Sequence, residues 1–271
     1  MTFGRSPSGL AALYADIGQQ LDRHVRLADA LAAVAETSVA RVPGADWASI
    51  TRGRGVSFET VAATDRAARQ VDDIQYELGR GPCVDAILQE TVFQTGDLGA
   101  DPRWPEFGKR AVAAAGVHSM LSFRLFLEDD DLIAGLNLYS TGKDVFDDDA
   151  LTVGTVLATH GALAISAAAA RERAAHLQQA LLTNREIGVA MGVLMNQHKI
   201  TRSAAFDLLR VASQNTNRKL AEIATEVADT GILHLPGQPA GKPPANRRVN
   251  SAPTPLRPAG AEGTGSPDRS R

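Results

Sequence analysis

Hydrophobic positions recur with helical spacing through the second half of the chain. Between residues 177 and 227, apolar residues return every three or four positions, which is the period of amphipathic helices. The three runs are Ile187, Ala190, Met191 and Leu194; Phe206, Leu209 and Ala212, or Ala205, Leu208 and Ala212; and Leu220, Ile223, Ala224 and Val227. The pattern predicts a long helix followed by two short ones.

Residues that begin and end helices agree with this division. Thr201 and Asn217 each stand just before an apolar run, so we expect them to be the N-caps of the second and third helices. The first helix is expected to end near His198-Lys199, where a cation suits the carbonyl end of the helix dipole. The sequence Asp229-Thr230-Gly231 supplies the final stop.

The first half mixes helical and alternating patterns. Helical spacing covers residues 8–41, and Pro82 favours the start of another helix. The remaining expected elements are strands at 47–51 and 56–62, a hairpin of 121–127 and 132–140, and a closing helix at 150–170. This order predicts an α+β domain whose antiparallel sheet is covered by helices. The acidic run Asp129–Asp131 is interpreted as a solvated turn rather than a cation site.

One apolar stripe runs from the closing helix into the long helix of the second half. Its members alternate in spacing between four and three, and they are Leu163, Ala167, Ala170, Ala174, Leu177 and Leu181. This heptad-like spacing predicts one continuous helix between the two domains. The seam is short and rich in alanine, so by itself it favours only weak dimerisation.

Length and charge refine this picture. A chain of 271 residues with 44% hydrophobic content has room for one medium domain and one small domain. Residues 1–170 carry 14 basic and 23 acidic residues, whereas residues 171–234 carry 8 and 6. The rear part is therefore only mildly basic, which fits a few phosphate contacts better than strong binding to duplex nucleic acid.

Several classes of protein are disfavoured by what the sequence lacks. Cys83 is the single cysteine, which excludes internal disulfides and fits a reducing compartment. The apolar stretch 153–170 is alanine-rich and contains His160, so we do not expect it to span a membrane. Phosphate-binding, metalloprotease and hydrolase motifs are absent, and no histidine spacing indicates a metal site. We expect a cytoplasmic protein without catalytic activity, metal or cofactor.

The expected domain organisation has four parts. Residues 1–10 form a flexible N-terminus, 11–170 the α+β domain, and 171–234 the helical domain. Residues 235–271 are rich in proline and glycine and almost free of large apolar residues, so we expect them to be disordered.

The helical domain resembles the ANTAR domain, the RNA-binding output module of bacterial transcription antiterminators. The resembling residues are Arg185, Ile187, Ala190, Gly192, Leu194-Met195, Ala205-Phe206, Leu209-Arg210, Ser213-Gln214, Asn217-Arg218-Lys219-Leu220 and Ala224. The chain departs from the family pattern at Met191, where many members have lysine. The resemblance implies a three-helix module that holds hairpin loops in mRNA leaders.

Candidate RNA-binding residues follow from this resemblance and from their chemistry. They are Arg185, Ala190, Gly192, Arg210, Ser213, Gln214, Asn217, Arg218 and Lys219. Arginine and lysine neutralise phosphates, polar side chains read unpaired bases, and small residues permit close approach of a backbone. Taken singly, each residue also fits a cap, a turn or a solvated face.

The α+β domain is similar to the GAF domain, a sensory fold that carries small ligands between sheet and helices. The resembling blocks are Leu78-Gly79, Gly81-Pro82-Cys83, Asp97-Leu98, Asp101-Pro102-Arg103-Trp104-Pro105, Gly116-Val117-His118-Ser119 and Ile133–Ser140. Cys83 and His118 are its candidate ligand-binding residues. For Cys83, redox sensing, haem ligation and chromophore attachment compete with simple packing at a helix start.

The two resemblances together imply a homodimeric, signal-responsive antiterminator that prevents formation of a terminator hairpin. A sensor bound to an unknown small ligand or protein would control RNA binding through the continuous helix. A plain three-helix bundle, a sensor whose rear helices bind a protein partner, and a helix-turn-helix DNA-binding protein remain as alternatives.

Overall fold

The computed structural model describes residues 7–21, 23–24, 26–54, 57–89, 91–126 and 133–234. The chain divides into two compact units, Met1–Thr183 and Asn184–Arg271, and each is described by itself. The acidic run Asp129–Asp131, the tail 235–271 and residues 1–6 lie outside the described residues. Residues 7–10, expected to be flexible, belong to the first helix, α1 (Pro7–Leu21).

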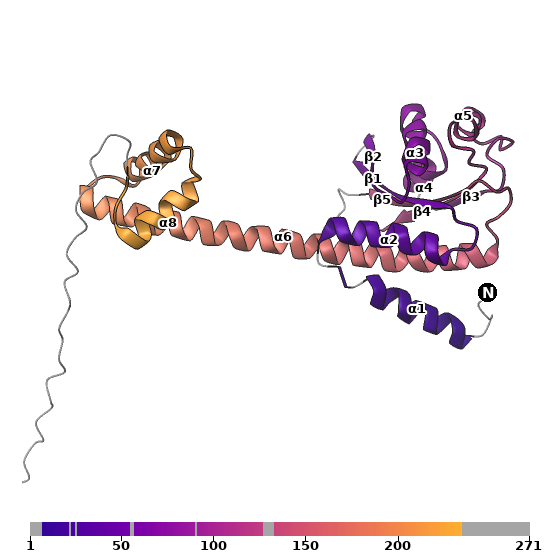
Figure 1. The fold of residues 1–271 in the computed structure, drawn as a ribbon, viewed down its shortest axis with the longest axis horizontal. Helices are drawn as coiled ribbons and strands as arrows, with labels where there is room; N and C mark the ends of the chain where they lie inside the picture. Colours follow the sequence, from indigo (N-terminus) through magenta and orange to yellow (C-terminus); the bar gives the residue numbers. More distant parts are fainter. Residues whose placement is uncertain are drawn as a thin grey trace, which may run out of the picture. The chain divides into compact units, whose positions relative to one another are not determined.

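A five-stranded antiparallel sheet forms the centre of the first unit (Figure 1). Its strand order is β2-β1-β5-β4-β3, and each pair of neighbours is antiparallel. The strands are β1 (Trp47–Arg54), β2 (Ser57–Ala63), β3 (Val92–Thr95), β4 (Ser119–Leu125) and β5 (Ile133–Ser140). The central strand β5 therefore contributes side chains to the middle of both faces.

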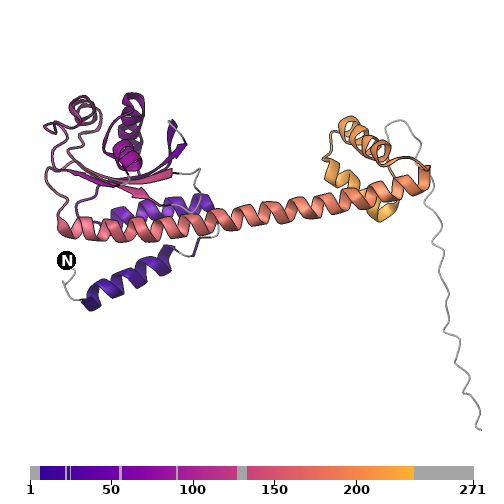
Figure 2. The ribbon, with the colours of Figure 1, turned by 180° about the vertical axis from the view of Figure 1, so that it is seen from behind.

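Helices cover both faces of this sheet (Figures 1 and 2). On one face lie α2 (Leu27–Arg41) and the first part of α6 (Asp148–His198), and α1 packs outside these two helices (Figure 1). On the other lie α3 (Arg66–Leu78), α4 (Pro82–Gln89) and α5 (Pro105–Ala115). Because neighbouring strand residues point to opposite faces, Leu136 and Leu138 join the first core, whereas Asn137 and Tyr139 face α3 and α4.

The predicted α+β class and its hairpin, β4–β5, are confirmed. Three elements were missed: α3, β3 and α5. Helix α3 is largely polar, and its ends depend on local chemistry: Asp65 accepts a hydrogen bond from the Ala67 N–H at 2.7 Å, and Gly79 adopts a left-handed conformation. Strand β3 has only four residues, which is too short for alternation to be recognised.

The second unit contains the end of α6, then α7 (Arg202–Thr216) and α8 (Leu220–Thr230). Its core consists of Ala190, Leu194, Ala205, Leu209, Ala212, Ile223, Ala224 and Val227. The predicted helix ends at His198 and Gly231 are confirmed, and Thr201 caps α7 by accepting a hydrogen bond from the Ala204 N–H at 3.3 Å. The three predicted helical runs therefore pack into one small hydrophobic core.

The expected role of Asn217 as an N-cap is wrong. Asn217 has φ 50° and ψ 35° and ends α7, with its N–H donating to the Ser213 carbonyl. Lys219 occupies the N-cap position of α8 and makes no side-chain capping bond. Asparagine tolerates the left-handed region better than most residues, which explains why it closes the preceding helix instead of opening the next one.

The continuous helix predicted from the apolar stripe is observed as α6. This helix is long and apolar enough to cross a membrane, and half of its most apolar stretch is buried inside the protein. Such burial is also typical of the core helix of a soluble domain, so length and composition carry little weight here.

Candidate RNA interface and sensor interior

The turn between α7 and α8 brings together several of the predicted RNA-binding residues. The Ser213 hydroxyl donates to the Arg218 carbonyl at 2.6 Å, and the Arg218 N–H donates to the Ser213 carbonyl at 3.2 Å. With Asn217 in its left-handed conformation, these bonds close the turn and fix the backbone of Arg218. Ser213 thus holds the turn through its side chain, a role that the sequence alone did not reveal.

Three of the candidate residues lie along one side of α7. Arg210, Gln214 and Asn217 are four and three residues apart, so they are neighbours on the helix surface. All three are exposed, as is Lys219 in the following turn. The arrangement presents amide groups and cations together on a solvent-accessible surface.

Two of the three cations in this region have acidic partners. Arg210 lies 3.1 Å from Asp207, and Arg218 lies 2.7 Å from one carboxyl oxygen of Glu226. The Arg218 guanidinium holds the pKa of Glu226 below its usual range. Within the part of the chain that the structure describes, Lys219 forms no ion pair. These exposed pairs contribute little stability, so a phosphate can replace the carboxylate at small cost.

The candidates on α6 divide into exposed and buried residues. Arg185 and Gly192 are exposed, and their separation of seven residues places them on the same side of the helix. Ala190 is fully buried in the core of the second unit, so its side chain packs between helices and does not face solvent. The expectation of an RNA contact by Ala190 is therefore corrected to a packing role.

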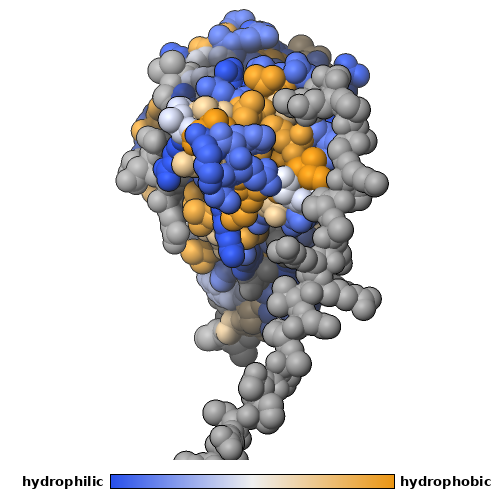
Figure 3. Space-filling model, turned by 90° about the vertical axis from the view of Figure 1, so that its left-hand side faces the viewer, coloured by the Kyte–Doolittle hydropathy of each residue, from blue (hydrophilic) through white to orange (hydrophobic). Residues whose placement is uncertain are grey.

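Glycine on α6 is not required by packing within this unit. A Cβ atom added at Gly188 or Gly192 would meet no atom within 4 Å. Apolar side chains are exposed nearby as well: Val189 is 46% exposed, Phe206 40% and Val211 39%. Figure 3 shows hydrophobic residues among hydrophilic ones on the side of the molecule that it draws.

In the first unit, the candidate Cys83 is fully buried. Its N–H donates to the Gln75 side-chain oxygen at 2.9 Å, and its Sγ lies 3.2 Å from the Thr51 hydroxyl. Burial, together with the nearby Asp72 carboxyl, raises the pKa of the thiol to about 12. The thiol is therefore neutral at physiological pH, which favours packing over redox chemistry.

The second candidate, His118, has a different environment. It is partly exposed just before β4, and its Nδ1 lies 3.3 Å from an oxygen of Asp97. Cys83 is at the start of α4 and has other hydrogen-bond partners. Among the residues that the structure describes, no cluster of three or more His, Cys, Asp or Glu residues could hold a metal.

A buried polar cluster on the sheet face that α3, α4 and α5 cover was missed by sequence reasoning. Asp72 of α3 is fully buried and accepts hydrogen bonds from the hydroxyls of Tyr139 and Thr60 and from the Asn137 amide. Burial raises the pKa of Asp72 to about 6. The alternation of Asn137 and Tyr139 with leucines in β5 was the signal that could have indicated a polar inner face.

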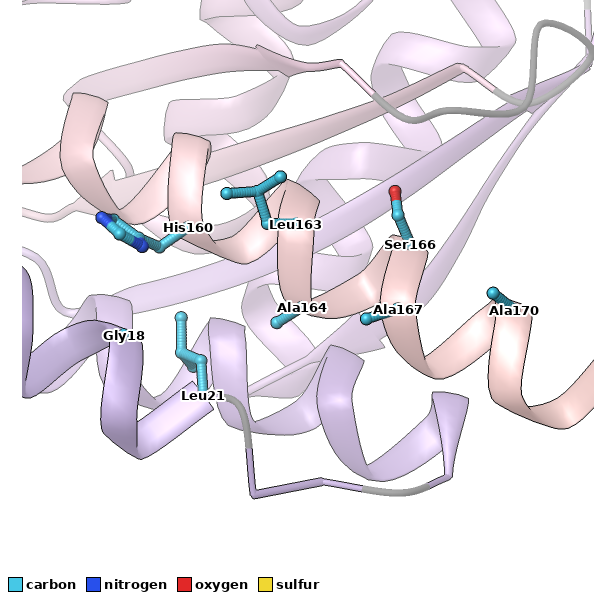
Figure 4. Close-up of a pocket in the computed structure, with 8 residues that line it drawn as sticks. All are labelled: Gly18, Leu21, His160, Leu163, Ala164, Ser166, Ala167 and Ala170. Carbon is cyan, nitrogen blue, oxygen red and sulfur yellow. The ribbon is translucent and has the colours of Figure 1, made fainter.

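A groove also lies between α1 and α6 within the first unit (Figure 4). Its volume is about 490 Å³, and it is lined by Gly18, Leu21, His160, Leu163, Ala164, Ser166, Ala167 and Ala170. Three of the six stripe positions predicted from the sequence belong to this lining: Leu163, Ala167 and Ala170. The apolar stripe therefore begins in this groove.

Comparison with known proteins identifies both domains. A family model of the GAF domain matches residues 22–166, and a model of the ANTAR domain matches residues 175–227. No curated protein matches the chain.

Solved structures are similar to part of this chain at low identity. The GAF domain of a phosphoenolpyruvate-protein phosphotransferase from Coxiella burnetii is 18% identical, with TM-score 0.48, covering 60% of this chain and 96% of that one. A free methionine-R-sulfoxide reductase from Neisseria meningitidis is 18% identical, with TM-score 0.46, covering 65% and 98%.

The GAF match spans more than half of the chain and coincides with the sheet and its covering helices. The ANTAR match coincides with the end of α6, α7 and α8. GAF domains are sensors, and ANTAR domains are the RNA-binding modules of antiterminators. The chain therefore belongs to the GAF domain family and carries an ANTAR domain after its sensor domain.

Proposed function

We propose that this protein is a cytoplasmic, signal-responsive transcription antiterminator. It binds hairpin loops in nascent mRNA and thereby prevents a competing terminator from forming. The observation that carries this proposal is the α7–α8 turn, where exposed amides and cations gather on a backbone fixed by the Ser213–Arg218 hydrogen bonds. The protein acts by binding, without catalysis.

Each residue type has a distinct role in the proposed interface. Arg210, Arg218 and Lys219 neutralise phosphates, and the two arginines exchange their acidic partners for phosphate oxygens. Gln214 and Asn217 offer donors and acceptors to unpaired bases of a loop. Arg185 and Gly192 lie on an open side of α6, where the missing side chain of Gly192 permits a close approach.

The proposal includes a homodimer formed along α6. All residues from 171 to 182 are exposed, and among them Leu177 is 67% and Leu181 69% exposed. Exposed leucines at coiled-coil spacing are stabilised when a second helix covers them. The groove beside Leu163 continues the same stripe. In the proposed mechanism, a small ligand or a protein bound by the sensor domain changes this pairing and so controls access to RNA.

A protein partner for α7 is the alternative function. It is favoured by the partial exposure of Phe206 and Val211 on α7. A partner helix would cover these side chains, whereas RNA binding by the α7–α8 turn does not require them. Replacement of both by serine would weaken protein capture and leave RNA binding unchanged.

The proposed function is tested by measuring the affinity of the purified protein for transcripts with short-loop hairpins near terminators. Mutated loops and duplex DNA of equal length serve as controls, at physiological salt. A truncation that removes the sensor domain covers the case in which that domain inhibits binding. Loop-dependent binding is expected, whereas equal affinity for all three nucleic acids would contradict the proposal.

A triple variant, R210Q/R218Q/K219Q, locates the interface. We expect an affinity loss of about tenfold to a hundredfold and a salt dependence reduced by about two counterions, since single strands release about 0.7 per contact. The matched control is Arg202→Gln, which removes one exposed cation from the opposite end of α7. An equal loss in the control would indicate diffuse electrostatic attraction instead of a defined interface.

A further inference from the structure

The face of the sensor sheet that α3, α4 and α5 cover contains a row of polar residues at its centre. Ser49 of β1, Asn137 of β5 and Ser122 of β4 are aligned by strand register, and all three are fully buried. A polar row inside a core lowers stability unless each group finds a hydrogen-bond partner. The partners of this row are therefore informative about function.

The row is satisfied on one side and unsatisfied on the other. The Asn137 amide nitrogen donates to the hydroxyls of Ser49 at 3.1 Å and Thr51 at 3.0 Å, both on β1. Its amide oxygen is buried and has no hydrogen-bond partner. The Ser122 hydroxyl, at the paired position on β4, has none either. The Asn137 amide oxygen and the Ser122 hydroxyl, on adjacent strands, are thus both buried without a hydrogen-bond partner.

The orientation of the Asn137 amide follows from the charge beside it. Asp72 lies 3.3 Å from the amide nitrogen, and an ionised carboxylate requires donors. If the amide were reversed, its oxygen would face the carboxylate and repel it. The unpaired oxygen is consequently directed away from the Asp72 carboxylate whenever Asp72 is charged.

In the part of the chain that the structure describes, Asp72 also forms no ion pair with a cation. Its hydrogen bonds come from neutral groups, and the charged side chain that acts on it is the like-charged Asp73. Its pKa of about 6 leaves it mostly ionised at neutral pH. A buried carboxylate without a cation is costly, and a nearby cation would offset much of that cost.

We propose that this cluster binds a small cation carrying N–H groups, either the ammonium ion or the protonated amine of a small metabolite. The N–H groups donate to the Asn137 amide oxygen and the Ser122 hydroxyl, and the positive charge compensates Asp72. This inference rests on the sensor half of the proposed function and names the chemistry of its signal.

A third buried group without a hydrogen-bond partner distinguishes the ammonium ion from a larger amine. The Gln75 amide nitrogen is buried without a partner, while its oxygen accepts from the Cys83 N–H at 2.9 Å. This nitrogen can donate to an acceptor on a larger amine, such as a carboxylate or carbonyl oxygen. Ammonium alone would leave it unused.

The experiment titrates the full chain with chloride salts at constant ionic strength and records the unfolding midpoint of the sensor domain. The probes are ammonium, methylammonium and glycinamide, with potassium and tetramethylammonium as cations that lack N–H groups. A saturable rise of the midpoint is expected for at least one N–H cation and for neither control, because a ligand stabilises the state it binds. Stronger binding of glycinamide than of ammonium would identify an amine-bearing ligand.

Variants assign any observed binding to this cluster. Asp72→Asn and Ser122→Ala are each expected to weaken binding of the cation about tenfold or more. Each variant removes an interaction with a charged group, and such interactions are stronger than those between neutral groups. Asp73→Asn is the matched control, because it removes the same charge one residue away on an exposed position. Ser122→Ala removes a hydroxyl without a partner, so it does not threaten folding.

Three results would overturn the proposal. An equal effect of potassium would show a general cation site without N–H recognition. No saturation with any probe would mean that water satisfies these oxygens. Unchanged binding in Asp72→Asn and Ser122→Ala would place the site elsewhere. The measurement involves no RNA, so failure of RNA binding and failure of cation binding remain separate outcomes.

Discussion

The inner face of the sensor sheet and the α7–α8 turn both collect polar residues, but in opposite environments. Asp72, Asn137 and Ser122 are fully buried and lie next to one another in a closed core. Gln214 and Lys219 are exposed, and their polar atoms are available to solvent. Buried polar groups contribute through their mutual hydrogen bonds, whereas exposed groups contribute almost nothing to folding. Function in the first region is therefore tied to stability, and in the second it is not.

The comparison also extends to charge. Asp72 forms no ion pair with a cation among the described residues, and burial raises its pKa, whereas Glu226 is a partly exposed anion whose pKa is lowered by Arg218. A buried uncompensated charge responds strongly to any bound cation, since little water screens it. Surface pairs respond weakly and are sensitive to salt. The sensor interior is consequently suited to small ligands and the turn to a polyanion.

The largest expected contrast comes from two alanine substitutions. Asn137→Ala removes the donor shared by Ser49, Thr51 and Asp72 and should lower the free energy of unfolding of the sensor domain by about 3 to 4 kcal/mol. Gln214→Ala should change stability by less than about 0.5 kcal/mol and weaken RNA binding. Urea unfolding and RNA titration of both variants check this, and similar stability losses would abolish the distinction between the regions.

A second expectation concerns the pH dependence of stability. The pKa of Asp72 is about 6 in the folded protein, above its ordinary value of 3.8, so the folded state binds a proton more tightly. The free energy of unfolding should therefore fall as pH rises from about 4 to 6, by up to about 3 kcal/mol, and then level off. The neighbouring Tyr76, Tyr139 and Cys83 stay neutral in this range, because burial raises their pKa values.

The variant Asp72→Asn isolates this contribution. In this variant, the free energy of unfolding should depend less on pH between pH 4 and 6. At pH 7.5 the variant should be at least as stable as the wild type. Thermal unfolding across this range, with Asp73→Asn as control, provides the measurement. An unchanged slope in Asp72→Asn would show that other groups cause it.

The smallest effect should separate stability from RNA affinity within the ANTAR domain. Gly192→Ala places a methyl group in open space and should stabilise α6 by about 1 kcal/mol, because alanine favours helices over glycine. If RNA approaches this side of the helix, affinity should fall while stability rises. Gly188→Ala, also in open space on α6, is the companion variant. Unchanged RNA affinity in both would remove α6 from the proposed interface.

Much of the fold could be predicted because its patterns are local. The helices α7 and α8, the β4–β5 hairpin and the cap at Thr201 follow from periodicity and short-range chemistry. Asn217 shows where local reasoning fails, because the same residue type suits an N-cap and a left-handed helix end. In the packed unit, α7 extends to Thr216, and Asn217 therefore ends this helix instead of starting α8.

The candidate RNA-binding residues differ in their exposure to solvent. Arg210, Gln214 and Lys219 are exposed, as a binding role requires, whereas Ala190 is buried. Small size suits both a helix contact and an RNA contact, and only burial separates the two. Asp72 was not recognised, since a carboxylate in a polar helix such as α3 is usually solvated.

The sequence by itself determined the two-domain architecture, the α+β and helical classes and the family resemblances, because periodicity, turn residues and short motifs are properties of neighbouring positions. Tertiary structure alone decided that Asp72, Asn137 and Ser122, which are far apart in the chain, meet on one inner face of the sheet. The reason is physical: strand register and helix packing set which side chains share a low-dielectric interior. The energies of charges and unpaired polar groups depend on that environment more than on residue type.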